Sequence, residues 1–499
     1  MKLKVQVINI ETGFSPIVII NHRDAIKYDL HPSDRVLVET VGKKTKKNVI
    51  TGVDVIMKDG AVKQGEIGVL LEAATALNVK KGDTVDIHPA PKPESLKYIR
   101  KKMHGEQLSA HELERIVRDI VAGVLTEVEL AYFVAAVAMH ELNLEEVTAL
   151  TKAVAKTGST FNTHRKPVAD KHCIGGVPGN RTTMIVIPIV AAFGLIIPKT
   201  SSRAITSPAG TADTMETLCN VELGLKDMQR VVEKTGACIV WGGSLGLAPA
   251  DDRIIRVEKP LSIDAPGMML SSVMAKKFSV GATHVLIDIP FGKTAKAEKR
   301  FDAEELRQHF LTLGKLLGMQ LTIMITDGRQ PIGRGIGPVL ETRDVLSVLK
   351  NDADAPGDLR EKSLKLAAEM LEFCGGVKRG AGYEMAKDIL ESGSAWRKMQ
   401  EIIQAQGPSK EEFRLGHMRA KLLAHRSGTV RAIDNKDISK IARMAGAPIT
   451  KGAGLYLHKK VGDKVKKGEA LYTAYADSAE KIRHVRKYHN ELMPYTIGY

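Results

Sequence analysis

Apolar and polar residues alternate in short runs through residues 1–88, with turn-forming residues between the runs. Alternation with a period of two is typical of β-strands, so this part predicts a small β-rich domain. Through residues 96–162 the apolar residues recur instead with helical spacing, and SAHE at 109–112 and TEVE at 126–129 are capping boxes that open two amphipathic helices. A helical domain is therefore expected, after a proline-rich linker at 88–95.

The rest of the chain predicts two further domains. Predicted strands and helices alternate through residues 165–430, which is typical of a layered α/β domain, and we expect about 250–280 to complete the helical domain. Residues 431–499 predict a C-terminal β-rich module. Its VGDKVKKGE turn at 461–469 resembles the hammerhead of lipoyl-type domains but lacks their modified-lysine signature, so a structural cap is expected. The predicted fold class is multidomain α/β.

The N-terminal domain contains an internal repeat. AIKYDLHPSDRVLV at 25–38 and ALNVKKGDTVDI at 76–87 each combine a short helix, a tight turn that ends at Asp34 or Asp83, and a strand. This pairing resembles the duplicated unit of double-psi β-barrels. A barrel-like domain is therefore expected at the N-terminus.

The formal net charge of +15 needs an explanation, and lysines cluster at 43–47 and 459–468. Neither cluster is interleaved with aromatic residues, which make up only 4% of the chain, so the stacking surface of a nucleic-acid binder is not indicated. Solvated lysine faces and attraction of small anions remain as explanations. We expect no nucleic-acid partner.

Targeting and cysteine signals are also weak. No apolar run reaches the ~18 residues of a membrane span, and the start of the chain lacks the apolar block of a signal peptide. We therefore expect a cytoplasmic protein without a membrane partner. The four cysteines include no CxxC pair, so neither a disulfide framework nor a zinc site is indicated.

The first candidate for chemistry is ADKHCIGGVPGNRTTM at 169–184. A predicted strand delivers Lys171 and His172 to a glycine-rich loop, and a helix is expected to start within 181–195. Free backbone N–H groups at a helix N-terminus, flanked by lysine, suit phosphate binding. The loop is not a Walker A motif, and an ordinary strand-to-helix connection is the alternative.

A second candidate is TSSRAITSPAGTAD at 200–213, which contains six hydroxyl side chains and Arg203. This density of donors suits one or two anions. A third segment, DGRQPIGRGIGPVLE at 327–341, mimics a dinucleotide fingerprint, but its G-x-G-x-G spacing and the proline that follows do not fit one. We expect it to be a structural or substrate-lining loop.

Read in order, four motifs carry a family resemblance. DKHCIGGVPGN at 170–180, SSRAITSPAGTADTME at 201–216, SLGLAPADDRI at 244–254 and SSVMAKK at 271–277 resemble the thymidine phosphorylase and pyrimidine nucleoside phosphorylase family. In that family the first two motifs hold orthophosphate. The resemblance covers most of residues 96–480.

The departures from the family pattern are specific. Cys173 replaces a serine, and residues 207–211 are Ser-Pro-Ala-Gly-Thr in place of His-Thr-Gly-Gly-Thr. The position near Val257 where the family carries a pyrimidine-contacting arginine has no clear counterpart. With the extra N-terminal domain, these differences resemble the archaeal AMP phosphorylase branch. The resemblance implies phosphorolysis of AMP, and also of CMP and UMP, by orthophosphate to free base and ribose 1,5-bisphosphate.

The resemblance also implies roles for residues. Asp264 would be the catalytic acid that protonates the leaving base, although a helix-capping or turn aspartate is the alternative in SIDAPG. The residues expected to bind nucleotide and phosphate are Lys171, His172, Gly176, Ser202, Arg203, Ala204, Ile205, Thr206, Ser207, Thr211, Ser272 and Lys296. Which hydroxyl serves which anion stays open.

The expected enzyme needs no metal and no cofactor, because orthophosphate is a co-substrate. Its expected partners are AMP and phosphate, and the family resemblance implies a homo-oligomer, a dimer or larger. The alternative enzyme is a thymidine or pyrimidine nucleoside phosphorylase. A non-enzymatic nucleotide-binding protein built on the N-terminal barrel is the alternative outside catalysis.

Overall fold

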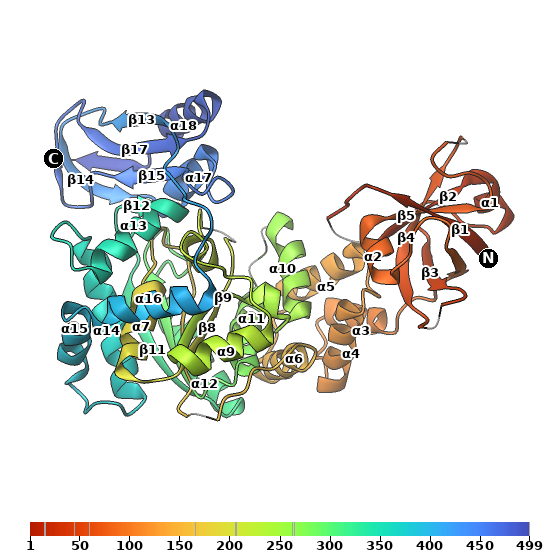
Figure 1. Ribbon diagram of the computed structural model, residues 1–499, viewed down its shortest axis with the longest axis horizontal. Helices are drawn as coiled ribbons and strands as arrows, with labels where there is room; N and C mark the ends of the chain where they lie inside the picture. The colour runs from red at the N-terminus through yellow and green to blue at the C-terminus, as the bar shows by residue number, and fades with distance from the viewer. Residues whose placement is uncertain are drawn as a thin grey trace. The chain divides into compact units, whose positions relative to one another are not determined.

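The computed structural model (Figure 1) describes residues 1–13, 16–43, 45–58, 60–164, 166–204, 207–261, 263 and 265–498. The chain forms two compact units. Met1–Thr157 and Pro249–Met269 make up the first, and Gly158–Ala248 and Leu270–Tyr499 make up the second. The finer division into four domains stays a prediction.

The first unit begins with a closed β-barrel whose strands follow the order β1-β5-β2-β4-β3-β6. The strands are β1 (Lys2–Ile8), β2 (Ile17–Asn21), β3 (Arg35–Thr40), β4 (Asn48–Ile56), β5 (Glu66–Leu70) and β6 (Thr84–Pro89), with helices α1 (His22–Lys27) and α2 (Leu71–Leu77). Alternate residues such as Val5, Val36 and Val69 are fully buried in its core, as the period of two predicts. The predicted barrel is confirmed, whereas the double-psi crossing stays a prediction.

The predicted repeat in the barrel is confirmed. Each copy has a helix, a turn and a strand, and the turns share one hydrogen-bond pattern: Asp34 Oδ2 accepts from the His31 N–H at 2.7 Å, and Asp83 Oδ2 from the Lys80 N–H at 3.1 Å. Aspartate suits these positions because its short side chain bonds nearby backbone N–H groups.

Helices complete the first unit: α3 (Ser95–Met103), α4 (Ala110–Val121), α5 (Glu127–Met139), α6 (Leu144–Lys156) and α10 (Pro249–Leu261). The predicted capping boxes are confirmed, since Ser109 pairs with Glu112 at the start of α4 and Thr126 with Glu129 at the start of α5. A third capping box, of Asn143 and Glu146, opens α6. Reciprocal side-chain bonds of this kind satisfy N–H groups that the first helical turn leaves without partners.

The second unit has a parallel sheet in the order β11-β10-β7 and a parallel pair, β8-β9. A parallel bridge between Val168 and Ile196 joins the two. The strands are β7 (Ala169–Cys173), β8 (Ile197–Ser201), β9 (Ala237–Trp241), β10 (His284–Phe291) and β11 (Gln320–Asp327). The helices are α7 (Thr183–Phe193), α8 (Thr211–Met215), α9 (Leu225–Thr235), α12 (Arg300–Leu316), α13 (Pro338–Leu349), α14 (Gly357–Phe373), α15 (Gly382–Glu391) and α16 (Ser394–Gln406), with a 3-10 turn at Gly242–Leu245. Helix α11 (Pro266–Ser279) begins in the first unit and continues into the second from Leu270. Ligands of such folds bind beyond the carboxyl ends of the parallel strands.

The C-terminal module contains two antiparallel sheets, β12-β15-β17-β13 and β16-β14-β18, and two helices (Figure 1). Their bounds are β12 (Gly335–Ile336), β13 (Met418–Leu423), β14 (Gly428–Ile433), α17 (Asn435–Ala445), β15 (Gly454–Leu457), β16 (Lys464–Val465), β17 (Ala470–Ala476), α18 (Ala479–Leu492) and β18 (Tyr495–Gly498). Strand β12 comes from the α/β part of the chain, so backbone hydrogen bonds join the module to that part. The hammerhead comparison stays a prediction.

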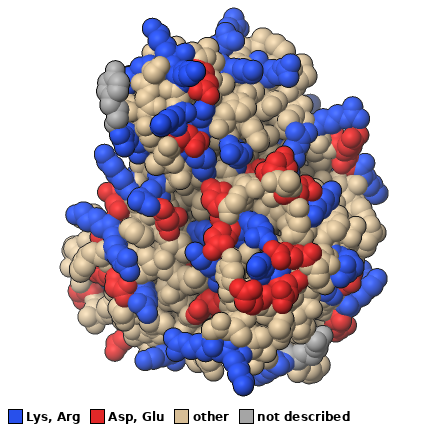
Figure 2. Space-filling model, turned by 90° about the vertical axis from the view of Figure 1, so that its left-hand side faces the viewer, with Lys and Arg blue, Asp and Glu red and all other residues tan. Residues whose placement is uncertain are grey.

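The surface carries mixed charge. On the face shown in Figure 2, Lys and Arg side chains alternate with Asp and Glu rather than forming one continuous basic surface. Within the described ranges, no helix is long and apolar enough to cross a membrane.

Candidate functional site

The glycine-rich loop leaves β7 and leads into α7, as the sequence predicts. Gly175, Gly176 and Gly179 all have positive φ, of 89°, 87° and 73°. A Cβ on Gly176 would lie 2.7 Å from the backbone nitrogen of Lys296, and one on Gly179 would lie 2.1 Å from the Ile332 carbonyl oxygen. Glycine is therefore required both for the backbone conformation and for the close approach of two other segments.

Those contacts bring predicted segments together. Lys296 lies against Gly176, so two of the predicted binding residues are neighbours, and the Lys296 side chain is exposed. The Ile332 N–H donates to the Pro178 carbonyl at 3.1 Å, which places the segment 327–341 against the glycine loop. The segment contains a loop, the short strand β12 and the first turn of α13, and its loop packs against the predicted phosphate loop.

Lys171 lies fully buried on β7, two residues before the strand ends. Its Nζ donates to Thr182 Oγ1 at 2.9 Å and to Thr183 Oγ1 at 3.4 Å, and lies 3.9 Å from Asp288 Oδ2. Burial lowers the pKa of Lys171, while Asp288 opposes that shift. The ammonium therefore sits at the junction between the glycine loop and the first turn of α7.

Lys171 belongs to a buried charge cluster. Lys199 and Lys277 lie 3.4 and 2.8 Å from the two oxygens of Asp170, and Lys362 lies 3.1 Å from Asp288. Burial disfavours ionisation of Asp288, but Lys362 and Lys171 hold its pKa below the ordinary value. The cluster holds four lysines and two carboxylates. Burial lowers the pKa of Lys199 well below its ordinary value, but the other three lysines still outnumber the carboxylates, and a buried excess of positive charge favours anions nearby.

His172 follows Lys171 on the same strand. Burial, with the neighbouring charges of Lys277 and Lys199, lowers the pKa of His172 well below 6.5. The imidazole is therefore neutral at physiological pH, and it does not add a positive charge to an anion site.

The hydroxyl-rich loop follows β8 and is tied together by Asp213. Asp213 Oδ2 accepts from the Ala204 N–H at 2.7 Å and from the Gly210 N–H at 2.8 Å. Ser207 Oγ donates to the Ala209 carbonyl at 2.6 Å. The carboxylate thus closes the loop on itself at the start of α8.

Arg203 is held by carboxylates. Its guanidinium donates to both Glu216 oxygens at 2.8 and 2.6 Å and to Glu222 at 2.7 Å, and it stacks over Trp241 at 4.9 Å. These carboxylates raise the pKa of Arg203. The sequence predicts Arg203 as a binding residue, but in this structure its side chain anchors the loop instead of presenting free donors.

The Arg203 anchor predicts a pH dependence of stability. Its hydrogen bonds lower the pKa of Glu216 from 4.5 to about 2, so the stability that Glu216 contributes is complete above pH 4.5 and is lost as pH falls toward 2. We expect the melting temperature of Glu216→Gln to decline less steeply than that of the wild type between pH 5 and pH 3, measured by circular dichroism. Parallel declines would contradict this assignment.

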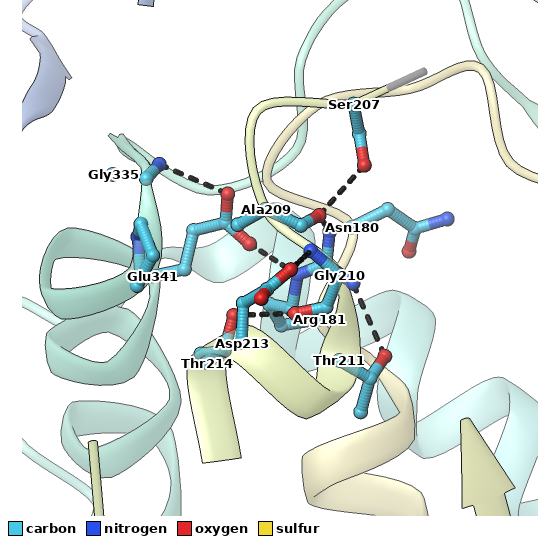
Figure 3. Close-up of polar contacts among 12 residues, drawn as sticks. Asn180, Arg181, Ser207, Ala209, Gly210, Thr211, Asp213, Thr214, Gly335 and Glu341 are labelled. Carbon is cyan, nitrogen blue, oxygen red and sulfur yellow. Dashed lines mark hydrogen bonds and ion pairs between the residues drawn. The ribbon is translucent and has the colours of Figure 1, made fainter. Parts of the chain in front are cut away.

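Arg181 lies at the centre of the site (Figure 3). Its Nη1 donates to Thr211 Oγ1 at 3.1 Å, its Nη2 to the Ala209 carbonyl at 2.6 Å, and its Nε to Glu341 Oε2. Glu341 is buried in the first turn of α13. Neither Arg181 nor Glu341 was predicted as a site residue.

Three segments that are distant in the sequence therefore converge at one place: the glycine loop, the hydroxyl-rich loop and the start of α13. The arrangement has backbone N–H groups, hydroxyls and buried lysines close together, and it has no cluster of three or more His, Cys, Asp or Glu placed to hold a metal among the described residues. Such a set of donors suits phosphate groups.

Family models match three segments of the chain: a glycosyl transferase family helical bundle domain at 96–158, the a/b domain of that family at 165–396, and a pyrimidine nucleoside phosphorylase C-terminal domain at 429–496. The chain is also 48% identical over 486 residues to proteins named AMP phosphorylase from Pyrococcus furiosus and Thermococcus kodakarensis; each match covers 97% of this chain and 95% of the relative. The chain belongs to the thymidine and pyrimidine nucleoside phosphorylase family.

Other relatives carry a different name within this phosphorylase family. A putative thymidine phosphorylase from Rhodopseudomonas palustris is 46% identical over 481 residues, covering 96% of this chain and 93% of the relative. The solved anthranilate phosphoribosyltransferase from Thermus thermophilus is 18% identical, with a TM-score of 0.51 over 62% of this chain and 98% of that one. That likeness shows a shared fold.

The structure describes only some of the remaining predicted binding and catalytic residues of this phosphorylase. Asp264, Ile205 and Thr206 lie outside the described residues. Ser202 is exposed after β8, and Ser272 is half-buried on α11. The structure thus groups the glycine loop, the hydroxyl-rich loop and Lys296, and it leaves the position of the predicted acid undescribed.

Cys173, the family's serine position, is a neutral thiol. Asn180 Nδ2 donates to its Sγ at 3.2 Å, and burial raises the pKa of Cys173 to about 11. The substitution therefore keeps a hydrogen-bond acceptor at this position but supplies no thiolate.

Proposed function

We propose that this chain is an AMP phosphorylase, which converts AMP and orthophosphate into adenine and ribose 1,5-bisphosphate, and which also cleaves CMP and UMP. The observation that carries the proposal is the convergence of two donor-rich loops beside a buried excess of lysines. A nucleotide substrate and orthophosphate bring two anions to one site, and a single phosphate loop would serve only one of them. The near full-length identity to proteins named AMP phosphorylase supports the choice of nucleotide.

In this reaction an oxygen of orthophosphate forms a bond to C1′ of the ribose while the bond from C1′ to the base nitrogen breaks. The electron pair of that bond leaves with the base, which takes up a proton. Because charge develops on an oxocarbenium-like sugar, most of the catalysis comes from positioning and electrostatics. Rigid loops with buried positive charge are suited to that task.

We assign orthophosphate to the glycine loop and its flanking residues. Gly176 exposes backbone at a positive φ, Lys171 supplies buried charge, and Thr182 and Thr183 present hydroxyls at the same place. The 5′-phosphate of the nucleotide goes to the hydroxyl-rich loop, where Ser202 and Thr211 offer hydroxyls and Ser207 joins them by turning its hydroxyl away from the Ala209 carbonyl. Lys296 and Ser272 complete the nucleotide site in this proposal.

Asp264 is assigned as the acid that protonates the departing base. A positioned general acid contributes about 10²–10⁴-fold to such a step. His172 does not compete for this role, because its imidazole is neutral at physiological pH. The enzyme uses no metal or cofactor in this proposal, acts in the cytoplasm, and forms a homo-oligomer, a dimer or larger.

A thymidine or pyrimidine nucleoside phosphorylase is the second candidate, favoured by relatives named putative thymidine phosphorylase. Two sequence features weigh against it. Ser207, Pro208 and Ala209 replace the His-Thr-Gly of the thymidine enzymes, and the position near Val257 where those enzymes carry a pyrimidine-contacting arginine has no clear counterpart.

The 5′-phosphate requirement separates the two candidates. We expect kcat/KM for AMP to exceed that for adenosine by at least about 100-fold, because buried groups built to hold a phosphate are left unpaired by the nucleoside. AMP, CMP, UMP, adenosine and thymidine are incubated with orthophosphate, and free base is measured by chromatography. Cleavage of thymidine together with intact AMP would overturn the proposal.

A further inference from the structure

Arg181 is a buried side chain whose guanidinium bonds to groups of two other segments. It is 7% exposed, and each of its three nitrogens donates one hydrogen bond, to a carboxylate, a hydroxyl and a carbonyl on those segments. Arginine suits this position because its planar fork can hold several acceptors in fixed directions, whereas lysine presents one compact charge.

Glu341 completes the arrangement from α13. It is 1% exposed, one oxygen takes the Arg181 bond, and the other accepts from the Gly337 N–H at 3.0 Å. Both oxygens therefore point along fixed directions. The Arg181 backbone is also constrained, because its N–H donates to the Gly179 carbonyl at 2.7 Å within the glycine loop.

These contacts link the glycine loop to the hydroxyl-rich loop, the two loops proposed to bind anions. The backbone of Arg181 belongs to the glycine loop, its Nη atoms hold Ala209 and Thr211 at the end of the hydroxyl-rich loop, and its Nε is fixed by Glu341 (Figure 3). Any shift of Arg181 changes the spacing between the loops and turns the Thr211 hydroxyl.

We propose that Arg181 and Glu341 are a positioning pair that sets the distance between the orthophosphate site and the nucleotide phosphate site. Arg181 acts through Thr211 and Ala209 and does not itself touch substrate. The inference rests on the proposed function, because it needs two bound anions. Productive attack on C1′ requires both anions at a fixed separation, and a misplacement of about 1 Å can cost about 100-fold in rate.

The test is a double-mutant cycle on the full chain with Arg181→Lys and Thr211→Val. If Arg181 acts through Thr211, each variant lowers kcat/KM by about 10-fold to 100-fold, and the double variant is hardly worse than the more damaged single variant. Factors that multiply in the double variant would overturn the proposal, as would an Arg181→Lys enzyme with wild-type kinetics.

Glu341→Gln, a nearly isosteric substitution, is a second test of the Arg181–Glu341 positioning pair. It keeps the side-chain volume but leaves the buried guanidinium of Arg181 without its charged partner, so we expect a lower melting temperature and, at a temperature where the variant is fully folded, a fall in kcat/KM of about 10-fold. Unchanged kinetics would overturn the proposal. The matched control is Arg360→Lys, which alters a partly exposed arginine paired with Glu391 on the surface and should keep wild-type kinetics.

The wild-type enzyme separates failure of this inference from failure of the proposed function. If the wild type cleaves AMP only with orthophosphate, the cycle is measured with AMP. If it cleaves AMP but the effects of Arg181→Lys and Thr211→Val multiply, only the inference fails. If it cleaves thymidine instead, the proposed function fails and the inference fails with it, because a nucleoside brings no second anion to the site.

Discussion

The Asp264→Asn variant is expected to lose turnover of AMP by a factor of about 10²–10⁴ while it still binds the nucleotide. Asparagine has nearly the shape of aspartate but cannot deliver a carboxyl proton to the leaving base. Adenine is a poor leaving group without that proton, so the bond to C1′ no longer breaks at a useful rate. Single-turnover base release measures the rate of the chemical step, and equilibrium binding of AMP measures the affinity for the nucleotide.

A control separates chemistry from a general loss of structure. Asp227→Asn changes an exposed aspartate that pairs with Arg230 on α9, so it should leave turnover and binding as in the wild type. Wild-type turnover by Asp264→Asn would remove Asp264 as the acid. Loss of both binding and turnover would assign it a binding role instead.

The Lys171→Met variant is expected to show the second large effect, a fall of about 100-fold in kcat/KM for orthophosphate. Removing the ammonium takes away the charge at the base of the glycine loop and the donor to Thr182 and Thr183. A charge-assisted hydrogen bond in a buried site contributes about 1.5–3 kcal/mol, which corresponds to a loss of this size. Initial rates at varied orthophosphate and saturating AMP measure it.

Lys362→Met is the matched control for Lys171→Met. Both lysines lie near the same carboxylate, Asp288, with Lys362 at 3.1 Å and Lys171 at 3.9 Å, but Lys171 also reaches the threonines at the start of α7. We expect both variants to lower the melting temperature, because each weakens the pairing of a buried carboxylate. Because Lys362 belongs to the same buried lysine excess but does not reach the threonines, Lys362→Met should lower kcat/KM for orthophosphate by less than Lys171→Met does, and equal kinetic losses would contradict the assignment.

Local features of the fold could be predicted from the sequence because short segments determine them. The capping boxes at Ser109 and Thr126 and the aspartate turns at Asp34 and Asp83 depend on residues three positions apart. The glycine loop before α7 is similar, since its positive φ angles require glycine wherever the loop is placed. These predictions are confirmed.

Long-range pairings could not be predicted in the same way. Arg181 and Glu341 are 160 positions apart, and nothing in their local sequence distinguishes them from surface residues. One feature of the sequence singles out Glu341, because this carboxylate lies in the first turn of the helix that follows the G-x-G-x-G segment. The identity of its partner, however, depends on how that segment packs on the glycine loop.

Arg203 is the reverse case, a residue that the sequence predicts as an anion ligand but whose guanidinium is occupied in the structure. An arginine among hydroxyls in a predicted anion loop suggests an anion ligand, yet Glu216 and Glu222 occupy its guanidinium. The two carboxylates follow α8 in the chain. They reach Arg203 only because the folded chain after α8 returns toward the loop. Side-chain availability is therefore a property of the folded structure and not of the motif.

The C-terminal module also contains more than its strand pattern suggested. Its predicted strand, turn and strand correspond to β15, β16 and β17, but two helices, α17 and α18, pack with them. Their signals are ordinary ones, since Asp434 and Ser478 cap the helices and buried residues recur at helical spacing.

The most direct test of the central claim is the identity of the sugar product. Wild-type enzyme is incubated with AMP, with and without orthophosphate, and followed by ³¹P NMR. We predict that ribose 1,5-bisphosphate, with two phosphorus resonances, forms only when orthophosphate is present, at one equivalent per adenine released. Adenine release without orthophosphate, with ribose 5-phosphate as the product, or no conversion of AMP while thymidine is cleaved, would contradict the account.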